Sequence, residues 1–332
     1  MSMEYLALSW YILIGFVIML YVLLDGYDLG IGILSVFFRK TADRDIMVSV
    51  ILPVWDGNGT WLVFGGAALY GAFPLAFSII LPTVYAPLVI MVLSLLLRGI
   101  SLEFRLKAQK TKQLWDMIFF IGSLSATICQ ALVLSAFISG FTDINGNIIE
   151  RAWVNPVVWA SIPGLIIGYM LLGSNRLIAK TTGIIQNKFF KASQVIQYLL
   201  VLAMITAVIL SPYADESLFH RWLDSKTSIY FATLLILALW VFVLHIIAVN
   251  NKAENKPFFC SVILFLISFV GLVLSSFPYL APHTITFMDA VAPRTSLNFM
   301  FWGALVGVPF LLFYTSYAYY TFRGKVHEPI GY

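Results

Sequence analysis

The sequence has little charge, cysteine or histidine, and each shortage excludes a class of protein. Charged residues make up 11% of the 332 positions and hydrophobic residues 61%, which excludes an ordinary soluble domain. The two cysteines, Cys129 and Cys260, lie inside apolar runs, so they form neither a disulfide framework nor a metal motif. Of the four histidines only His245 lies in an apolar run, whereas a b-type membrane haem takes two axial ligands. The chain also has no phosphate loop and no Ser/His/Asp set, so we expect it to carry no catalytic and no metal-ligating residue.

What the sequence does have is a series of long apolar runs, and about 20 such residues suffice to cross a bilayer. The gaps between the runs reach only roughly 16 residues, too few for a soluble domain with its own core. We therefore predict a single integral membrane domain over residues 1–332, all-α and polytopic, with about nine transmembrane helices in two four-helix bundles plus one extra helix. The predicted spans are 6–38, 51–73, 77–101, 116–139, 156–178, 192–211, 228–249, 258–280 and 297–322. The third is the weakest, because Pro74, Pro82 and Pro87 cluster around it.

Lysine and arginine in the loops predict the orientation, because cytoplasmic loops carry an excess of both. With the N-terminus outside, sixteen basic residues fall on the inner side and four on the outer side. The inner set is Arg39, Lys40, Arg44, Arg98, Arg105, Lys107, Lys110, Lys112, Arg176, Lys180, Lys188, Lys191, Lys252, Lys256, Arg323 and Lys325, and the outer set is Arg151, Arg221, Lys226 and Arg294. This division predicts a chain with its N-terminus outside and its C-terminus inside.

Two aspartates in the first apolar run are the leading candidates for function. Asp25 and Asp28 lie three residues apart, so a helix places both carboxyls on one face, in its inner half. A carboxylate at membrane depth costs roughly 2.5–3.5 kcal/mol, and residues kept at that cost usually face protein or water and have a function. Gly26 and Gly30 form a small-xxx-small pair, which lets a second helix come close.

A third acid, Asp56, begins the second predicted helix on the same inner side. The functional hypothesis is a proton path from the cytoplasm through Asp25, Asp28 and Asp56. The structural alternative is that Asp56 caps a helix and that the other two pair with arginine and hold helices together. For Asp25 and Asp28 the membrane depth favours function, and for Asp56 the two interpretations stay open.

Arg98, Glu103 and Arg105 lie near the inner end of the third span. Arg98 is deeper than the interface, so it either pairs with one of the aspartates or extends to the headgroups. His245, near the inner end of the seventh span, is expected to be hydrogen-bonded or interfacial rather than a metal ligand.

Four stretches of the chain, taken in order and spacing, carry a resemblance to a known family. They are Asp25-Gly26-Tyr27-Asp28-Leu29-Gly30-Ile31-Gly32, then Pro53-Val54-Trp55-Asp56-Gly57-Asn58 with Trp61-Leu62 and Gly65-Gly66-Ala67-Ala68-Leu69, then Arg98-Gly99-Ile100 with Glu103-Phe104-Arg105, and last Phe277-Pro278-Tyr279 through Asn298 and Pro309 to Phe322-Arg323-Gly324-Lys325. Together they resemble subunit II of the cytochrome bd quinol oxidases, including the cyanide-insensitive branch. The chain departs from the family at Gly59, where many members have Glu or Gln, and at Glu103, where some have Asp.

The resemblance implies a terminal oxidase of the bacterial cell (inner) membrane that oxidises quinol on the outer side and reduces dioxygen to water with cytoplasmic protons. The larger subunit I would ligate haem b and haem d and carry the quinol-binding loop, and this chain would be a scaffold that lines proton and dioxygen paths. The expected partners are subunit I, a small single-span subunit, membrane lipid and quinone, and no nucleic acid. On this basis the expected proton path is Asp25, Asp28 and Asp56, the expected subunit interface or dioxygen path is Trp55, Asn58, Trp61, Arg98, Glu103 and Arg105, and the expected helix-packing residues are Gly26, Gly30, Gly65 and Gly66.

Two other functions compete with this interpretation. A proton- or cation-coupled transporter would also use inner acids and glycine-broken helices, and it would act without a partner. A purely structural subunit would use the acids only to join helices. A neighbouring gene for a second multi-span protein with paired membrane His and Met residues would favour the oxidase.

The charge division predicts which loops an impermeant thiol reagent reaches in intact cells. The loops expected inside are residues 39–50, 102–115, 179–191 and 250–257. Cysteines introduced as Lys110→Cys or Lys188→Cys should label only after permeabilisation, whereas Asn145→Cys or Leu218→Cys should label from outside. Labelling of Lys110→Cys in intact cells, or protection of Asn145→Cys, would contradict the orientation.

Overall fold

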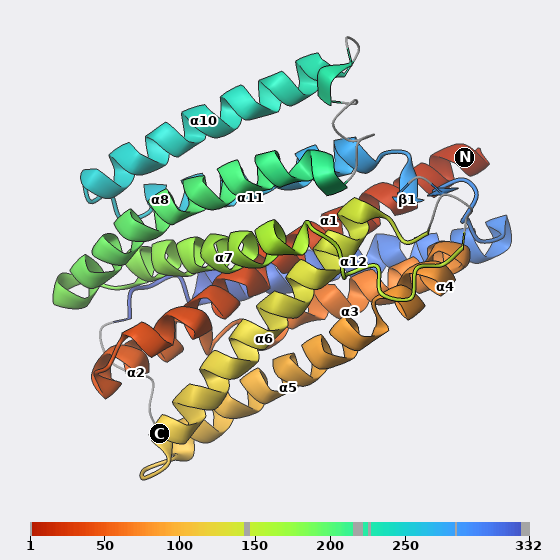
Figure 1. The fold of residues 1–332 in the computed structure, drawn as a ribbon. Helices are drawn as coiled ribbons and strands as arrows, with labels where there is room; N and C mark the ends of the chain where they lie inside the picture. The colour runs from red at the N-terminus through yellow and green to blue at the C-terminus, as the bar shows by residue number, and fades with distance from the viewer. Residues whose placement is uncertain (1, 143–146, 215–221, 225–226, 283, 327–332) are drawn as a thin grey trace.

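The computed structural model of the chain describes residues 2–142, 147–214, 222–224, 227–282 and 284–326. Figure 1 shows long helices lying side by side along one axis of the molecule. They are α1 (Met3–Leu34), α3 (Trp55–Ala72), α5 (Tyr85–Lys107), α6 (Lys112–Ser139), α7 (Val158–Lys180), α8 (Gly183–Ala214), α10 (Ser228–Asn250), α11 (Lys256–Ser276) and α12 (Arg294–Thr321). Among the described residues, eight helices are long and apolar enough to cross a membrane, and a bent pair containing α3 supplies a ninth. The all-α polytopic class is confirmed.

Helix α1 lies in the middle of the helix contacts. It packs on α3 and α6 on one side and on α7 on the other, and α5 pairs closely with α6 (Figure 1). Helices α7, α8, α10 and α11 contact one another as a second set, and α12 contacts α3 and α1. Because α1 and α6 also pack on α7, the two groups are joined, and the predicted arrangement in two four-helix bundles with one extra helix stays a prediction.

The inner half of α1 is buried on every side. All residues from Asp25 to Ser35 are buried, although the run contains two aspartates and three glycines. Neighbouring helices therefore surround this part of α1, whereas a surface helix keeps one polar or lipid-facing side. Tyr27, Leu29 and Ile31 belong to the largest apolar cluster of the chain, which joins residues of both helix groups.

Prolines and a charged segment move two predicted boundaries. The predicted inner loop 39–50 contains a helix, α2 (Thr41–Ile51), which meets α3 at an angle of 50°. The break lies at 52–54, where Pro53 has no N–H to continue the helix. The predicted third span, 77–101, is wrong at its start, because Pro74 begins a separate short helix α4 (Pro74–Thr83) and α5 begins only at Tyr85.

The end of the molecule near the start of α1 carries a small hairpin. Strands β1 (Tyr279–Ala281) and β2 (Ile285–Thr286) pair antiparallel after α11 ends at Ser276, so the predicted eighth span, 258–280, is too long. The hydroxyl and backbone N–H of Thr286 donate to Asp289, and these bonds lower the pKa of the Asp289 carboxyl. The hairpin covers the apolar end of α1 and α4 through Leu280 and Phe287.

Glycines let α1 and α7 touch backbone to backbone. A Cβ on Gly30 would lie 1.8 Å from the carbonyl oxygen of Tyr169, and one on Gly173 would lie 2.7 Å from the amide nitrogen of Ile31. Gly26 faces the ring of Tyr169, where a Cβ would be 2.6 Å from a ring carbon. The small-xxx-small pair of α1 therefore packs inside this chain and offers no surface to a partner.

The other two predicted packing glycines lie in α3 and differ from each other. A Cβ on Gly65 would meet Val17 and Ile18 of α1 at 3.4 and 3.5 Å, which is ordinary contact. A Cβ on Gly66 would meet nothing within 4 Å, so no described residue packs on it. Gly66 thus lies on the outer surface of α3.

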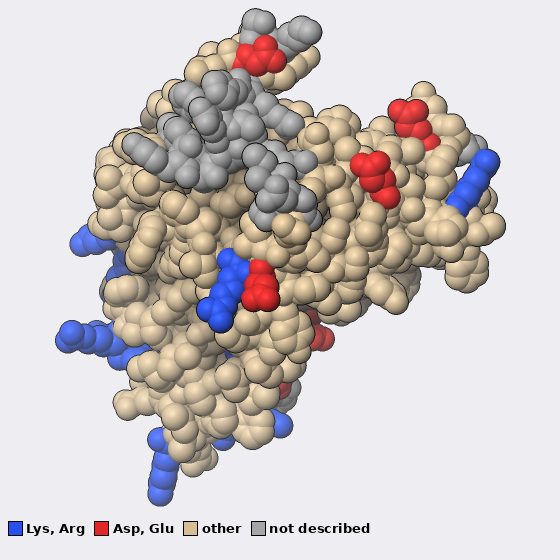
Figure 2. Space-filling model, turned by 45° about the vertical axis from the view of Figure 1, so that its right-hand side comes forward, with Lys and Arg blue, Asp and Glu red and all other residues tan. Residues whose placement is uncertain are grey.

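The basic residues predicted for the inner side gather at one end of the molecule. Apart from Arg98, which lies deeper in α5, these basic residues are found near the connections at this end. The connections are the segment after the 3₁₀ turn η1 (Ser35–Phe37), the α5–α6, α7–α8 and α10–α11 connections, and the segment after α12. On the face shown in Figure 2, most visible Lys and Arg side chains lie at the left and bottom of the view, whereas the Asp and Glu side chains are spread from top to bottom. The fold thus has one basic end, as the charge division requires.

The close approach of α1 and α7 predicts a strong difference between two glycines of α7. Gly173→Ala should lower the thermal midpoint of the purified protein, because overpacking at a backbone contact costs about 1–3 kcal/mol. Gly164→Ala is the matched control, since a Cβ there meets nothing within 4 Å, and alanine should leave the midpoint unchanged or raise it slightly. Equal midpoints for the two variants would contradict the contact.

Candidate functional site

Three polar side chains of α1 form one stripe. Tyr21, Asp25 and Asp28 stand at positions i, i+4 and i+7, which lie on one face of a helix, and all three are buried. The stripe spans about 10 Å along the helix, since each residue advances it 1.5 Å. Asp28 is the member nearest the basic end.

Asp25 forms a buried ion pair with Arg98 of α5. An arginine Nη1 donates to Asp25 Oδ1 at 2.7 Å, and the two side chains are 1% and 3% exposed. Gly122 of α6 lets α5 pack closely at this depth, because a Cβ there would lie 2.9 Å from the Ser94 carbonyl oxygen of α5. Of the two interpretations left open for Arg98, the structure shows pairing with an aspartate and not extension to the headgroups.

Asp28 is held by an amide and not by a cation. Asn58 of α3 donates from Nδ2 to Asp28 Oδ2 at 2.8 Å, and also lies within hydrogen-bond distance of the Leu24 carbonyl and the Tyr27 hydroxyl. The Tyr319 hydroxyl of α12 donates to Asn58 Oδ1 at 3.0 Å. Asp28 Oδ1 and Asp25 Oδ2 are buried and have no hydrogen-bond partner among the described residues.

Tyr21 extends the stripe toward the middle of the membrane. Gln130 of α6 donates to the Tyr21 hydroxyl at 2.6 Å, and its Oε1 accepts from the Tyr169 hydroxyl of α7 at 2.7 Å. One glutamine thus joins three helices. The polar groups from Asn58 to Tyr169 follow the inner half of α1 without leaving the protein interior.

The remaining sequence-predicted site residues do not join this cluster as a set. Asp56 is exposed in the first turn of α3, and Glu103 is exposed on α5. Trp55 lies against Gly99, where a Cβ would be 2.8 Å from its ring, and Trp61 is buried against Val17 and Tyr21. The structure therefore brings together Asp25, Asp28, Asn58 and Arg98, and leaves Asp56 and Glu103 at the surface.

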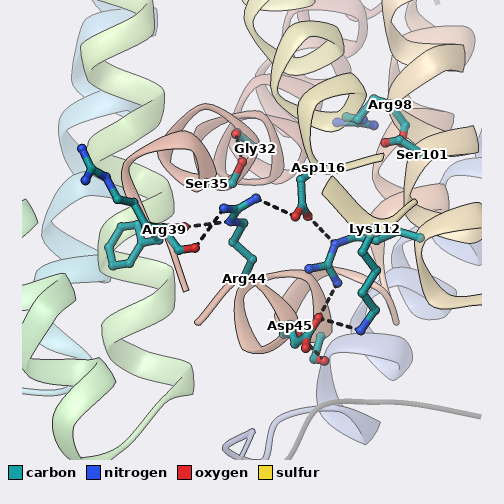
Figure 3. Close-up of polar contacts among 12 residues, drawn as sticks. Gly32, Ser35, Arg39, Arg44, Asp45, Arg98, Ser101, Lys112 and Asp116 are labelled. Atoms are coloured by element: carbon teal, nitrogen blue, oxygen red, sulfur yellow. Dashed lines mark hydrogen bonds and ion pairs between the residues drawn. The ribbon is translucent and has the colours of Figure 1, made fainter. Parts of the chain in front are cut away.

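Arg105 belongs to a separate network at the basic end, whose other members Arg44, Asp45, Lys112 and Asp116 are labelled in Figure 3. Its Nε donates to Asp116 Oδ1 at 2.5 Å and its Nη1 to Asp45 Oδ1 at 2.7 Å. Arg44 donates to Asp116 Oδ2 at 2.6 Å, and Lys112 lies 3.2 Å from Asp45. This network ties α2 to α5 and α6, and Arg98 lies apart from it in the same view.

The chain beyond α12 is fixed to the same end. Lys180 donates to the Phe322 carbonyl at 2.5 Å, and the Val326 amide donates to the Lys180 carbonyl at 2.8 Å. Lys325 lies 2.7 Å from Glu254, and its hydrogen bond, with one from Gln186, lowers the pKa of that carboxyl. The segment after α12 thus packs on the ends of α7 and α10.

Comparison with known proteins decides the family. A family model described as "Cytochrome bd terminal oxidase subunit II" matches residues 6–322, nearly the whole chain. The chain belongs to the cytochrome bd subunit II family. As a member it is a subunit of an oxidoreductase complex and a multi-pass membrane protein of the bacterial type, and the resemblance drawn from its motifs is confirmed.

Individual relatives match over their full length. The chain is 26% identical over 339 residues to cytochrome bd ubiquinol oxidase subunit 2 of Bacillus subtilis (strain 168), covering 97% of this chain and 98% of the relative. It is 24% identical over 367 residues to cytochrome bd-I ubiquinol oxidase subunit 2 of Escherichia coli (strain K12), covering 97% and 96%. The solved structure of bd oxidase from Geobacillus thermodenitrificans has the same fold, with a TM-score of 0.79 at 16% identity over 92% of this chain and 95% of that one. These comparisons give the transporter alternative no support.

His245, the histidine within a span, does not fit an axial haem ligand. Its Nε2 lies 2.8 Å from Asn175 Nδ2 and its Nδ1 lies 3.1 Å from Gln197 Oε1, so both ring nitrogens already have partners. Ser193 donates to Asn175 Oδ1 at 2.7 Å, which fixes the amide that faces the ring. Among the described residues no group of three or more His, Cys, Asp or Glu side chains could hold a metal. His220, His283 and His327 lie outside the described residues.

Sequence reasoning missed several polar residues that the fold brings together. Asp45 and Asp116 each pair with an arginine, and Asp43 pairs with Lys188 of α8. Tyr319 and Gln130 each join helices distant in sequence. A polar side chain within an apolar run was the available signal for Gln130, whereas the partners of Asp43, Asp45 and Tyr319 depend on tertiary packing.

The buried ion pair predicts a reciprocal effect on assembly. Arg98→Gln should reduce the yield of folded complex strongly, because an unpaired buried charge costs about 3–5 kcal/mol. Adding Asp25→Asn should restore much of the yield, since it removes the charge left without a partner. Size-exclusion chromatography after detergent extraction measures both, with Lys107→Gln on the exposed side of α5 as the control. A normal yield for Arg98→Gln alone would contradict the pairing.

Proposed function

We propose that this chain is the haem-free subunit of a quinol:dioxygen oxidoreductase and that Asp25 and Asp28 handle protons taken from the cytoplasm. Its partner would be a larger subunit I that ligates haem b and haem d and binds quinol. Family membership supports the complex, and the engaged nitrogens of His245 support placing the haems on the partner. A small single-span subunit, lipid and quinone complete the proposed set of partners.

The surface of α3 and α12 is the face that we propose for subunit I. Only 11% of the most apolar window of α12 is buried within the chain, the lowest share among the eight candidate spans. Phe299, Trp302 and Phe310 are 83%, 67% and 67% exposed along α12, and Gly66 is open on the neighbouring α3. This face therefore offers large aromatic side chains beside a small residue, which suits close helix packing.

One observation carries the proposal for proton handling: two buried carboxyls share one buried arginine. Arg98 pairs directly with Asp25, while Asp28, one turn away, receives only the amide of Asn58. A second carboxylate at this depth, without its own cation in contact, is costly unless it can take a proton. Asp28 is thus the member of the pair suited to accept and release a proton, with Asp25 held as the charged partner of Arg98.

The position of Asp28 supports uptake from the basic end. It is the acid of the stripe nearest that end, which the charge division predicts to be cytoplasmic. Asp56 lies exposed at the start of α3, two residues before Asn58. We propose Asp56 as the first acid of the route on the cytoplasmic side. It would lie at the surface or at the contact with subunit I, where an acid raises the local proton concentration.

Asparagine substitutions test this proposal in the complex purified through a tag on this chain. Asp→Asn keeps size and hydrogen bonding and removes the titratable group. From the sequence, Asp28 would be the least sensitive of the three acids, because water near the surface would replace it. Its complete burial reverses that expectation: Asp28→Asn should lower oxygen consumption about 100-fold, the lower end of the range for a positioned proton-transfer group, and Asp56→Asn should lower it less.

The reduced-minus-oxidised spectrum of each preparation separates proton transfer from assembly. Normal haem content with slow turnover is the expected result for Asp28→Asn. Unmodified turnover in all three variants would show that the acids are structural. Loss of haem in each variant would assign them to interhelical pairing, and stoichiometric haem on this polypeptide without a partner would overturn the assignment of the haems to subunit I.

A further inference from the structure

The amide that holds Asp28 is itself part of a closed ring of hydrogen bonds. Asn58 Nδ2 lies 3.2 Å from the Tyr27 hydroxyl, the Tyr27 hydroxyl lies 2.5 Å from that of Tyr319, and the Tyr319 hydroxyl donates to Asn58 Oδ1 at 3.0 Å. Tyr319 donates to Asn58 Oδ1, so the Tyr27 hydroxyl donates to Tyr319. The two N–H groups of Asn58 are shared among the Tyr27 hydroxyl, Asp28 Oδ2 and the Leu24 carbonyl, and this shared donation closes the ring.

The surroundings of Asn58 select the direction of this ring. Its Nδ2 also faces the Leu24 carbonyl at 3.1 Å and Asp28 Oδ2 at 2.8 Å, both of which are acceptors. A reversed amide would place its oxygen against these two oxygens and would leave Asp28 Oδ2 without a donor. The Tyr319 hydroxyl completes the arrangement, because it satisfies the amide oxygen at the opposite end.

The ring connects three helices that sequence does not place together. Tyr27 and Asp28 are neighbours on α1, Asn58 lies on α3, and Tyr319 lies in the last turns of α12. The guanidinium of Arg176 on α7 lies 5.2 and 5.3 Å from the centres of the Tyr27 and Tyr319 rings, which fixes both rings from the other side. The orientation of Asn58, which donates to Asp28, therefore depends on a residue of α12.

We propose that Tyr319 and Tyr27 are positioning residues that hold Asn58 so that it donates to Asp28, and that they thereby set how readily Asp28 takes and releases a proton. This inference rests on the proposed role of Asp28 and adds the residues that tune it. The tyrosines act through Asn58, since neither has a hydrogen bond to the Asp28 carboxyl among the described contacts.

The charges around Asp28 define what a pH profile reports. Asp25 lies on the same helix, Arg98 on α5 faces both carboxyls, and Arg176 on α7 faces the tyrosines. These three groups stay in place in a Tyr→Phe variant, which removes only a hydroxyl. A change in the profile of such a variant therefore follows from the lost hydrogen bond.

The test compares Tyr319→Phe and Tyr27→Phe in the purified complex, measuring oxygen consumption against pH. Without the ring, Asn58 donates less firmly to the carboxylate of Asp28, so the pH profile of turnover should shift. The midpoint of its alkaline limb should move by about half a unit to one unit, and turnover at neutral pH should fall about threefold to tenfold. Tyr198→Phe, on the exposed side of α8 and away from the face proposed for subunit I, is the control and should change neither quantity.

Two double variants show whether the effect passes through the ring and through Asp28. Tyr27→Phe with Tyr319→Phe should resemble Tyr319→Phe alone, because both break the same ring. Tyr319→Phe added to Asp28→Asn should cause no further change. An unshifted profile for Tyr319→Phe, additive effects of the two tyrosines, or a further loss in the Asp28→Asn background would each overturn the inference. Failure of the proposed function is distinct, since there Asp28→Asn itself would leave turnover unchanged.

Discussion

The rest of this structure depends on a single buried arginine that faces two carboxyls at membrane depth. Arg98 cannot be moved toward the headgroups without leaving Asp25 as an unpaired charge in a medium that does not solvate it. Helix α5 must therefore keep its depth and rotation relative to α1. Gly99 and Gly122 make this position sterically available, because Trp55 and the backbone of α5 occupy the space that their side chains would fill.

A second constraint fixes α1 from the opposite side. Gly30 and Gly173 bring the backbones of α1 and α7 into contact, and one turn away the Tyr169 ring of α7 packs on Gly26. Helix α1 is thus held by charge on the side of α5 and by steric fit on the side of α7. A helix fixed in this way keeps the orientation of its polar stripe, which a proton-transfer group requires.

The ion pairs at the basic end have a different physical character. In the network of Figure 3, Arg44 and Asp45 are each 18% exposed, whereas Arg105 and Asp116 are 2% and 5% exposed. Exposed ion pairs are individually worth about 0–1 kcal/mol, so the outer pairs of Arg44 and Asp45 act mainly by fixing the direction of α2. The network also explains why a segment that looks like a charged loop in the sequence forms a helix in contact with α5 and α6.

The sequence predicted what is local and missed what depends on distant partners. The spans follow from apolar length, and Asp25 and Asp28 follow from the cost of a carboxylate in a bilayer, so both were available from the chain alone. Where α3 and α4 begin depends on how Pro53 and Pro74 break the chain, and the number of apolar residues does not reveal these breaks. Grouping Asp56 with the other acids assumed that a shared membrane depth implies contact, whereas the rotation of α3 turns Asn58 inward and Asp56 outward.

Tyr319 shows the same limit and also gives the site a dependence on assembly. The sequence of α12 contains many aromatic residues, and nothing in it distinguishes Tyr319 from the others. The role of its hydroxyl in hydrogen bonding follows only from the packing of α12 against α1 and α3. Yet α12 is the candidate span with the least buried surface within the chain, so a partner that covers it would contribute much of what holds it in place. The hydrogen bonding of Asp28 would then be complete only when that partner is bound. Under the proposed function, such a carboxyl would transfer protons in the assembled complex and not in the isolated subunit.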